Sequence, residues 1–374
     1  MSAQRDLPQQ QSRATEARLL ELRTEAATFG KVQAVGTRIP GAPFPVASPE
    51  TGYYGVPLLK QPQWSWEIPL YFFVGGAAAS AAVIAAVANW TGDDERLRRD
   101  GRLVAAAGSA ISSVLLISDL GKHERFLNML RVFKPQSPMS MGAWVLAVFG
   151  SMSGAVATAE LLEQRFGWRI MRVLGNVVEP LSVAAALPFS NYTGVLIGAT
   201  VVPVWNHNVR SLPVHFGMSG LNSGVGVLEL AGHAGSTPLN TLGIGAAAWE
   251  TWEGIEVELF RDPVVNEPLR HGVSGWVTRA GGLFSGPVPL GLRLASLFAP
   301  RPVARKLRKI AAVSSIVGSL CTRYGWMAAG KSSAKDWRLP LQRKKAPRKI
   351  NRRQSIEQFP RKEGIVDDRE RHAV

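Results

Sequence analysis

Between residues 66 and 330 the chain alternates long apolar segments with short polar connections. An apolar helix of about 20 residues matches the hydrocarbon thickness of a bilayer. A 265-residue apolar region with few charges is hard to reconcile with a single soluble core. The sequence therefore predicts an all-α integral membrane protein.

The positions of the apolar segments predict a bundle of about eight transmembrane helices with polar N- and C-terminal tails. We place the helices at residues 66–90, 101–121, 142–164, 173–199, 209–231, 238–260, 277–299 and 307–328. We expect Pro180 and Pro188 to break the fourth helix, because proline lacks the backbone N–H that a helix needs. The chain then divides into a polar N-terminal segment 1–65, a membrane domain 66–330 and a basic, disordered tail 331–374.

The charge of the chain is strongly positive, with a net charge of +15 and an isoelectric point near 10.4. Basic residues gather in the C-terminal tail, where they indicate an anchor on anionic lipid, and no nucleic-acid-binding motif accompanies them. The distribution of Lys and Arg around the helices predicts cytoplasmic termini, with Arg301–Lys309 as the main opposing group. We therefore expect a multi-pass protein of the cell (cytoplasmic) membrane that binds lipid and no nucleic acid.

The chain has few residues that could hold a metal, a haem or an iron–sulfur cluster. Cys321 is the single cysteine, so the chain alone cannot hold an iron–sulfur cluster, which needs about four ligands. The six histidines make no evident pair on facing helices, as a membrane haem would require. Glu229 and His233 share a helix face, but the paired Glu-x-x-His spacing of a carboxylate-bridged metal site is absent. We predict no haem, cluster or metal in this chain.

Ionisable residues nevertheless occur in or beside the predicted helices. They are Glu67, Asp119, Glu160, Glu179, Glu229, Glu250, Glu253, Arg279, Arg293 and Arg323. Burying one at the centre of a bilayer costs at least about 2.5–3.5 kcal/mol. A proton path, an ion path or a polar ligand would explain them, and so would hydrogen bonds between helices.

The connection from Ser118 to Trp144 is the most polar of those between helices. Asp119 ends the preceding apolar segment, and a His, a Glu and several basic residues follow it. Polar groups at a helix end in lipid must be paired or must face water or protein. This connection is therefore a candidate place for polar chemistry at the edge of the bilayer.

The connection after the second helix contains two short motifs, Asp119-Leu120-Gly121 and Ser137-Pro138-Met139-Ser140. These motifs resemble the NrfD-like family, the membrane subunits of the polysulfide reductase and formate-dependent nitrite reductase group. Lys122-His123 replaces the usual Arg-Pro pair of that family. Further similar segments are Thr51–Gly76, Asn191–Trp205 and Arg323–Asp336. The resemblance covers about residues 51–336.

The resemblance implies an eight-helix subunit that exchanges electrons and protons between membrane quinone, either menaquinone or ubiquinone, and an iron–sulfur partner. That partner would serve a catalytic subunit, for which a molybdenum enzyme is the expected type. By itself the chain would not be a complete enzyme. Two rival functions remain open at this point, a polytopic ion or solute transporter and a purely structural membrane anchor.

The resemblance also selects candidate residues for a quinone site. Proton transfer at the quinone is assigned to Asp119, Glu67 and His123. The quinone pocket is assigned to Trp66, Arg125, Tyr192 and Trp205, because an apolar pocket with a few polar groups suits a quinone headgroup. Glu250 and Glu253 are candidates for a proton path through the bundle.

Overall fold

The computed structural model describes residues 59–92, 94–120 and 122–336, and these contain helices and no strands. The prediction of an all-α protein is thus confirmed for this part of the chain. Most of the polar segment 1–65 and most of the tail 331–374 lie outside the described residues.

The first four long helices agree closely with the sequence prediction. They are α2 (Glu67–Thr91), α3 (Glu95–Ser118), α4 (Pro138–Phe166) and α5 (Arg169–Gly198). Each is long and apolar enough to cross a membrane. Helix α5 continues through Pro180 and Pro188, so the expected break is wrong. Membrane helices tolerate proline where neighbouring groups satisfy the freed carbonyls.

Local sequence signals explain where these helices begin and end. Asp94 caps α3 by accepting the N–H groups of Arg96 and Leu97, and Ser137 caps α4 by accepting that of Ser140. Gly167 ends α4 in the left-handed conformation, at φ +70°, which glycine adopts without steric cost. The turns between the helices are thereby set by the residues at their ends.

The second half of the chain also contains long helices, at the positions predicted for the last four spans. Helix α7 (Leu212–Leu228) continues into the π-helix η3 (Glu229–His233), and α8 (Thr237–Leu259) follows. The predicted helix 277–299 is instead two helices, α10 (Gly272–Ser285) and α11 (Pro287–Phe298), since Gly286 leaves the helical conformation and Pro287 lacks an N–H. Helix α12 (Arg301–Lys335) is the longest.

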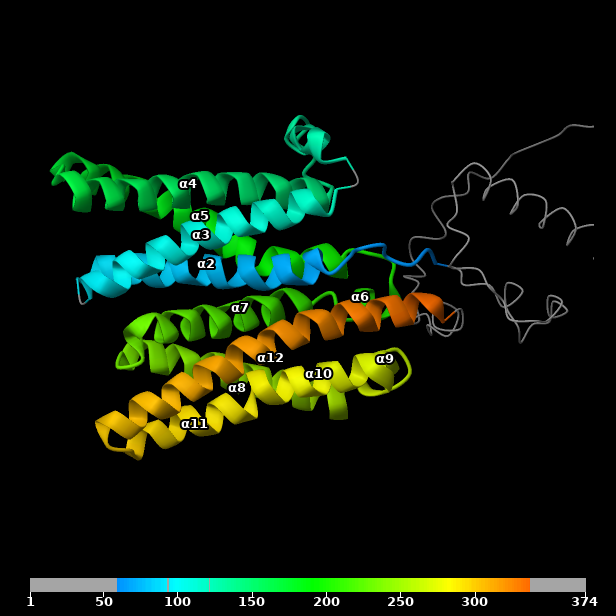
Figure 1. Cartoon of the computed structure of the whole chain (residues 1–374). Coiled ribbons are helices and arrows are strands. Elements are labelled where there is room, and N and C mark those ends of the chain that lie inside the picture. The colour runs from blue at the N-terminus through cyan, green and yellow to red at the C-terminus, as the bar shows by residue number, and fades with distance from the viewer. Residues whose placement is uncertain (1–58, 93, 121, 337–374) are drawn as a thin grey trace, which may run out of the picture. The chain divides into compact units, whose positions relative to one another are not determined.

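Three short helices lie in the connections. They are the 3₁₀ helix η2 (His123–Leu130), α6 (Pro203–His207) and α9 (Glu267–Arg270). All three lie at the end of the bundle where α2 begins and α12 ends (Figure 1). At that end the Lys331 ammonium donates to the Trp64 carbonyl at 2.6 Å, and the Tyr324 hydroxyl donates to the Trp66 carbonyl at 2.9 Å.

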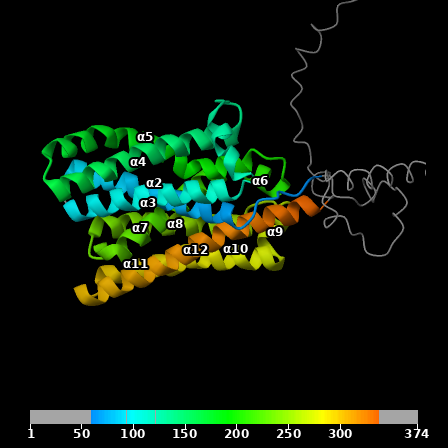
Figure 2. The same cartoon turned by 45° about the horizontal axis from the view of Figure 1, so that its top comes forward.

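The long helices form two groups that meet along α2 and α7, as Figures 1 and 2 show. Glycines permit this contact: a Cβ added at Gly76 would lie 3.2 Å from the Cα of Gly220, and one at Gly224 would lie 2.8 Å from the Cβ of Ser80. Small residues at a helix interface let backbones approach closely, which is how helices associate in lipid.

The outer surface of the described helices carries many large apolar side chains. Val114, Val177 and Trp276 are 63%, 66% and 75% exposed. Soluble proteins seldom expose such contiguous apolar surface, whereas lipid tails cover it without cost. With four helices that qualify as spans, this surface defines a multi-pass membrane protein.

Packing between α4 and α5 depends on Gly142, because a Cβ there would overlap the Tyr192 ring. We expect Gly142→Ala to lower the free energy of unfolding by about 1–3 kcal/mol, the usual cost of overpacking a core. Gly154→Ala on the same helix is the matched control, since a Cβ there meets nothing within 4 Å. Thermal unfolding in detergent measures both, and equal stability of the two variants would contradict the prediction.

Candidate functional site

Asp119 lies directly after α3, at the bundle end where α2 and α4 begin. Its carboxylate oxygen Oδ1 accepts a hydrogen bond of 2.5 Å from the Ser65 hydroxyl, which joins the end of α3 to the entry of α2. Oδ2 accepts no hydrogen bond from the part of the chain that the structure describes. Asp119 thus has one oxygen held by the protein and one available to a ligand.

A cavity of about 80 Å³ lies beside Asp119. Its walls are mostly apolar or aromatic, and they come from the entry of α2, the end of α3, η2, α4 and α5. The lining residues are Trp64, Ile68, Tyr71, Phe72, Leu116, Asp119, Leu120, Met129, Met139, Ala143, Tyr192 and Leu196. The structure therefore brings together Asp119 and Tyr192, which are far apart in the sequence and were assigned to one quinone site.

The other residues predicted at the helix entry lie outside this cavity lining. Trp66 is 60% exposed. Glu67 begins α2, and its buried Oε2 atom has no hydrogen-bond partner among the described residues. His123 and Arg125 are exposed on η2, where the His123 ring nitrogen Nε2 lies 3.2 Å from the Ser118 carbonyl. Their functional roles stay predictions.

Trp205 supports the cavity from behind. Its side chain is fully buried, its indole N–H donates to the Trp326 carbonyl at 2.8 Å, and its ring stacks on Trp64 with centroids 5.6 Å apart. Trp64 lines the cavity, whereas Trp205 lies outside its lining. Sequence reasoning passed over Trp64 and Tyr71, although both lie in the aromatic segment around Trp66 that carried the resemblance.

Glu250 and Glu253 are both buried on α8, but their partners differ. Glu253 forms an ion pair of 2.5 Å with Arg261. Glu250 accepts a hydrogen bond of 2.9 Å from the Ser285 hydroxyl and lies 3.7 Å from the His215 ring nitrogen Nδ1. The two acids therefore have separate partners, and any proton path through them stays a prediction.

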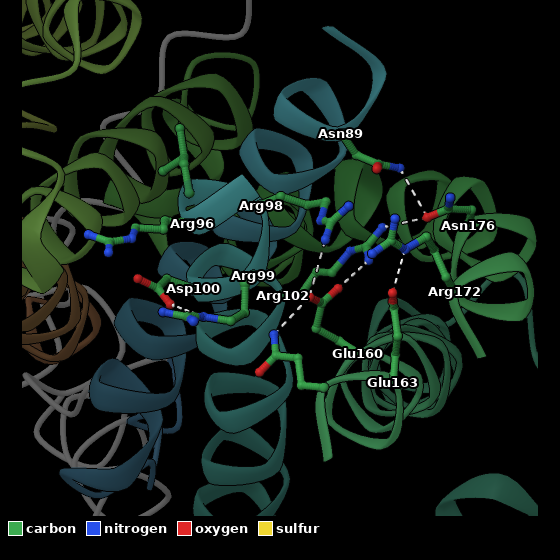
Figure 3. Close-up of polar contacts among 12 residues, drawn as sticks. Asn89, Arg96, Arg98, Arg99, Asp100, Arg102, Glu160, Glu163, Arg172 and Asn176 are labelled. Atoms are coloured by element: carbon green, nitrogen blue, oxygen red, sulfur yellow. Dashed lines mark hydrogen bonds and ion pairs between the residues drawn. The ribbon is translucent and has the colours of Figure 1, made fainter. Parts of the chain in front are cut away.

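Most of the other acids in the membrane helices are neutralised by arginine. Arg102, which is 3% exposed, bonds the Glu160 carboxylate at 2.6 Å and the Glu179 carboxylate at 2.8 Å. Its remaining nitrogen Nη2 donates to the Asn176 side chain at 3.0 Å (Figure 3). A second buried pair joins Arg293 to Glu229 through two bonds of 2.7 and 2.8 Å.

These ion pairs account for acids that sequence reasoning had left open between function and structure. A charge buried in lipid is tolerated when a partner of opposite charge satisfies it. Glu160, Glu179 and Glu229 each have such a partner, and Arg279 pairs with Glu258. Glu67, Asp119 and Glu250 form no salt bridge with arginine or lysine in the described residues, although the charge of the buried Arg323 acts on Glu250.

No group of three or more His, Cys, Asp or Glu side chains in residues 59–92, 94–120 and 122–336 converges on a possible metal position. Glu229 and His233 are four residues apart, about one helical turn, but they have different partners. Glu229 pairs with Arg293, and His233 lies 3.0 Å from the Asp100 carboxylate. The positive φ of Gly232, +122°, breaks the helix between them.

The helices and their exposed apolar surface define a polytopic all-α membrane protein. Residues 58–234 match the family model NrfD, described as polysulphide reductase. The match runs from the entry of α2 to η3 and contains all the residues that line the Asp119 cavity. No curated protein matches the chain. The family indicates a membrane subunit of an oxidoreductase complex.

The Arg102 cluster yields a prediction about stability. Arg102→Met leaves the buried carboxylate of Glu179 without an arginine, whereas Glu160 keeps its ion pair with Arg98 at 3.3 Å. We expect this variant to lower the free energy of unfolding by about 3–5 kcal/mol, the usual cost of an unpaired buried charge. Arg172→Gln breaks the ion pair between Arg172 and Glu163 at the surface, where the Arg172 side chain is 52% exposed. This variant should lower the free energy of unfolding by about 1 kcal/mol or less. Chemical denaturation in mixed micelles compares the two variants.

The double variant Arg102→Met/Glu179→Gln tests the electrostatic cause. It removes the one carboxylate that Arg102→Met leaves without an arginine, so it should be more stable than Arg102→Met alone. A double variant that is equally unstable would mean that Arg102 acts through packing instead of charge.

Proposed function

We propose that the protein is the membrane subunit of a multisubunit oxidoreductase and exchanges electrons and protons between membrane quinone and an iron–sulfur partner. The observation that carries the proposal is the convergence of Asp119 and Tyr192 on one apolar cavity within the segment matched by the family. A quinone needs hydrogen-bond partners at its oxygens and a group that accepts or donates protons when its redox state changes. The cavity offers a carboxylate and a phenol for these tasks.

Asp119 is the proposed proton-transfer group. Ser65 holds its Oδ1 atom, so the carboxylate has a defined orientation at the cavity. A carboxylate within hydrogen-bond reach of a quinol hydroxyl can take its proton as the electrons leave. Glu67 is two residues after the Ser65 that bonds Asp119, and His123 is four residues after Asp119. These two residues are proposed to pass that proton on toward the polar end of the bundle.

The cavity must widen to hold a quinone ring, because its volume of about 80 Å³ is below the roughly 300 Å³ at which ligand pockets begin. Two of its walls are the methionines Met129 and Met139, and Met139 is 57% exposed. Methionine side chains have several rotatable bonds and adapt readily to irregular shapes. We infer that these two side chains move when the quinone enters.

The electron acceptor or donor is proposed to be a separate subunit. The chain has a single cysteine, which cannot hold an iron–sulfur cluster by itself. We place the iron–sulfur partner at the bundle end that carries η2, where Arg125 is exposed close to the Asp119 cavity. The partner would in turn serve a catalytic subunit, for which a molybdenum enzyme is the expected type.

We propose eight membrane crossings with both termini in the cytoplasm. The four additional crossings are α7 with η3, α8, α10 with α11, and α12. The two ends of the described chain lie at one end of the bundle, as an even number of crossings requires. The basic tail supports the cytoplasmic orientation.

Cysteine labelling tests this topology. In a Cys321→Ala background, single cysteines replace Arg125, Arg169, His271 or Arg301, which are all exposed. We expect a membrane-impermeant maleimide to label positions 125 and 271 from the cytoplasmic side and positions 169 and 301 from the opposite side. Labelling of 271 and 301 from one side would contradict a crossing by α10 and α11.

Replacing the proposed proton-transfer group tests the function. We expect Asp119→Asn to lower quinone-linked turnover of the complete complex about a hundredfold, a usual contribution of general acid–base catalysis. Glu124→Gln, an exposed acid of the same loop that does not line the cavity, is the matched control and should retain full turnover. Quinol-dependent electron transfer in native membranes is the measurement, with complex assembly checked by co-purification.

Unaltered turnover of the Asp119→Asn complex would refute the role of this residue. Two rival functions have other signatures. A structural anchor would assemble with its partners but would bind no quinone analogue, and a transporter would show solute-dependent flux without any partner subunit.

A further inference from the structure

A second and larger cavity, of about 420 Å³, lies in the other group of helices. Its walls come from α8, α10 and α12, with one residue each from α7, α9 and α11, and no residue lines both this cavity and the one at Asp119. Its volume falls within the roughly 300–1,000 Å³ of ligand sites in proteins. The cavity is therefore large enough for a molecule and separate from the site described above.

The walls of this cavity are mainly apolar, and it opens toward the outer surface of the bundle. The apolar lining residues include Ile255, Val257, Leu259, Leu269, Leu283 and Pro287. Leu259 and Leu283 are also 71% and 50% exposed on the outside, beside the exposed rings of Trp252 and Trp276. A molecule dissolved in the bilayer can reach such an opening from the lipid without crossing water.

Two buried polar side chains, His215 and Glu250, also line the cavity. They are 3% and 2% exposed, and the Nδ1 atom of His215 lies 3.7 Å from the Oε1 atom of Glu250. Neither atom has a hydrogen-bond partner among the described residues. A buried polar atom without a partner costs about 1–3 kcal/mol, so a ligand that bonds both atoms would recover this loss.

The neighbours of these two side chains define what each can offer. The Trp326 indole N–H donates to His215 Nε2 at 3.1 Å, so the neutral imidazole carries its proton on Nδ1 and presents a donor there. Ser285 occupies Glu250 Oε2, which leaves Oε1 as the acceptor. Glu253, which also lines the cavity, is already paired with Arg261. The cavity thus presents one donor and one acceptor side by side.

We propose that this cavity binds a second molecule of the quinone class. The quinone carbonyl would accept the His215 Nδ1–H bond, the hydroxyl of the reduced form would donate to Glu250, and the apolar tail would leave between α8 and α10 into lipid. A phospholipid acyl chain has no group that could satisfy either polar atom. The identity of the ligand rests on the proposed quinone function, whereas the site itself rests on the cavity and its two unpartnered atoms.

Glycines in the wall allow the cavity to be filled with little other change. A Cβ added at Gly282 meets nothing within 4 Å, and Gly282 lines the cavity, so the side chain of Gly282→Leu enters the open space. Gly254 has the same two properties. Gly245→Leu on α8 is the matched control, because Gly245 is exposed, equally uncrowded and absent from the lining.

The experiment titrates menadiol, the reduced form of the short naphthoquinone menadione, into the purified full-length chain in nanodiscs under anaerobic conditions and measures bound ligand by equilibrium dialysis. We expect two classes of site in the wild-type chain and in Gly245→Leu. Gly282→Leu should lose one class, and Glu250→Gln should weaken that same class about tenfold, as expected when a hydrogen bond to a charged group is lost. Asp119→Asn should weaken only the other class.

The outcomes separate this inference from the proposed function. Unchanged menadiol binding in both Gly282→Leu and Glu250→Gln overturns the inference, whatever Asp119→Asn does. A phospholipid that is retained by the wild-type chain and lost from Gly282→Leu, with menadiol binding unchanged, overturns it in favour of lipid. Loss of binding in Gly282→Leu with no effect of Asp119→Asn upholds the second site and removes support from the first. If Gly282→Leu does not fold, Gly254→Leu and Glu250→Gln decide.

Discussion

The pairing of buried charges is the constraint on which the rest of this membrane domain depends. Arg102 on α3 bonds Glu160 on α4 and Glu179 on α5, so one guanidinium joins three helices inside the apolar bundle. The Arg293–Glu229 pair likewise joins two elements, α11 and η3. In lipid the hydrophobic effect does not hold helices together, so such paired charges and close backbone contacts set which helices are neighbours. The pairs also leave few buried acids for chemistry.

The two cavities lie in different helix groups and are linked by contacts among three tryptophans. Trp64 lines the Asp119 cavity and stacks on Trp205, whose N–H bonds the backbone of Trp326. Trp326 lines the second cavity and bonds His215. Trp205 thus contacts the wall of the Asp119 cavity without lining the cavity itself. It supports the wall of one cavity and is bonded to the wall of the other.

Much of the fold was predictable because lipid imposes length and composition on each helix directly. The bounds of α2 to α5 follow from apolar runs and from capping residues such as Asp94 and Ser137. The interruption between α10 and α11 was missed, since a Gly-Pro pair within an apolar run leaves its hydropathy almost unchanged. The break expected in α5 did not occur. A membrane helix can continue through a proline when groups on neighbouring helices satisfy the carbonyls that the proline leaves free.

The sequence by itself determined an all-helical membrane protein with a segment that matches the NrfD family, because both follow from local composition and motif. Asp119 became a candidate in the same way. Only the tertiary structure decided which acids are satisfied, since a salt bridge joins residues far apart in the chain. Glu160 and Glu250 look alike in sequence, yet one is held by Arg102 and the other has an unpartnered oxygen at a cavity. That difference depends on which helix faces which, and no local pattern records it.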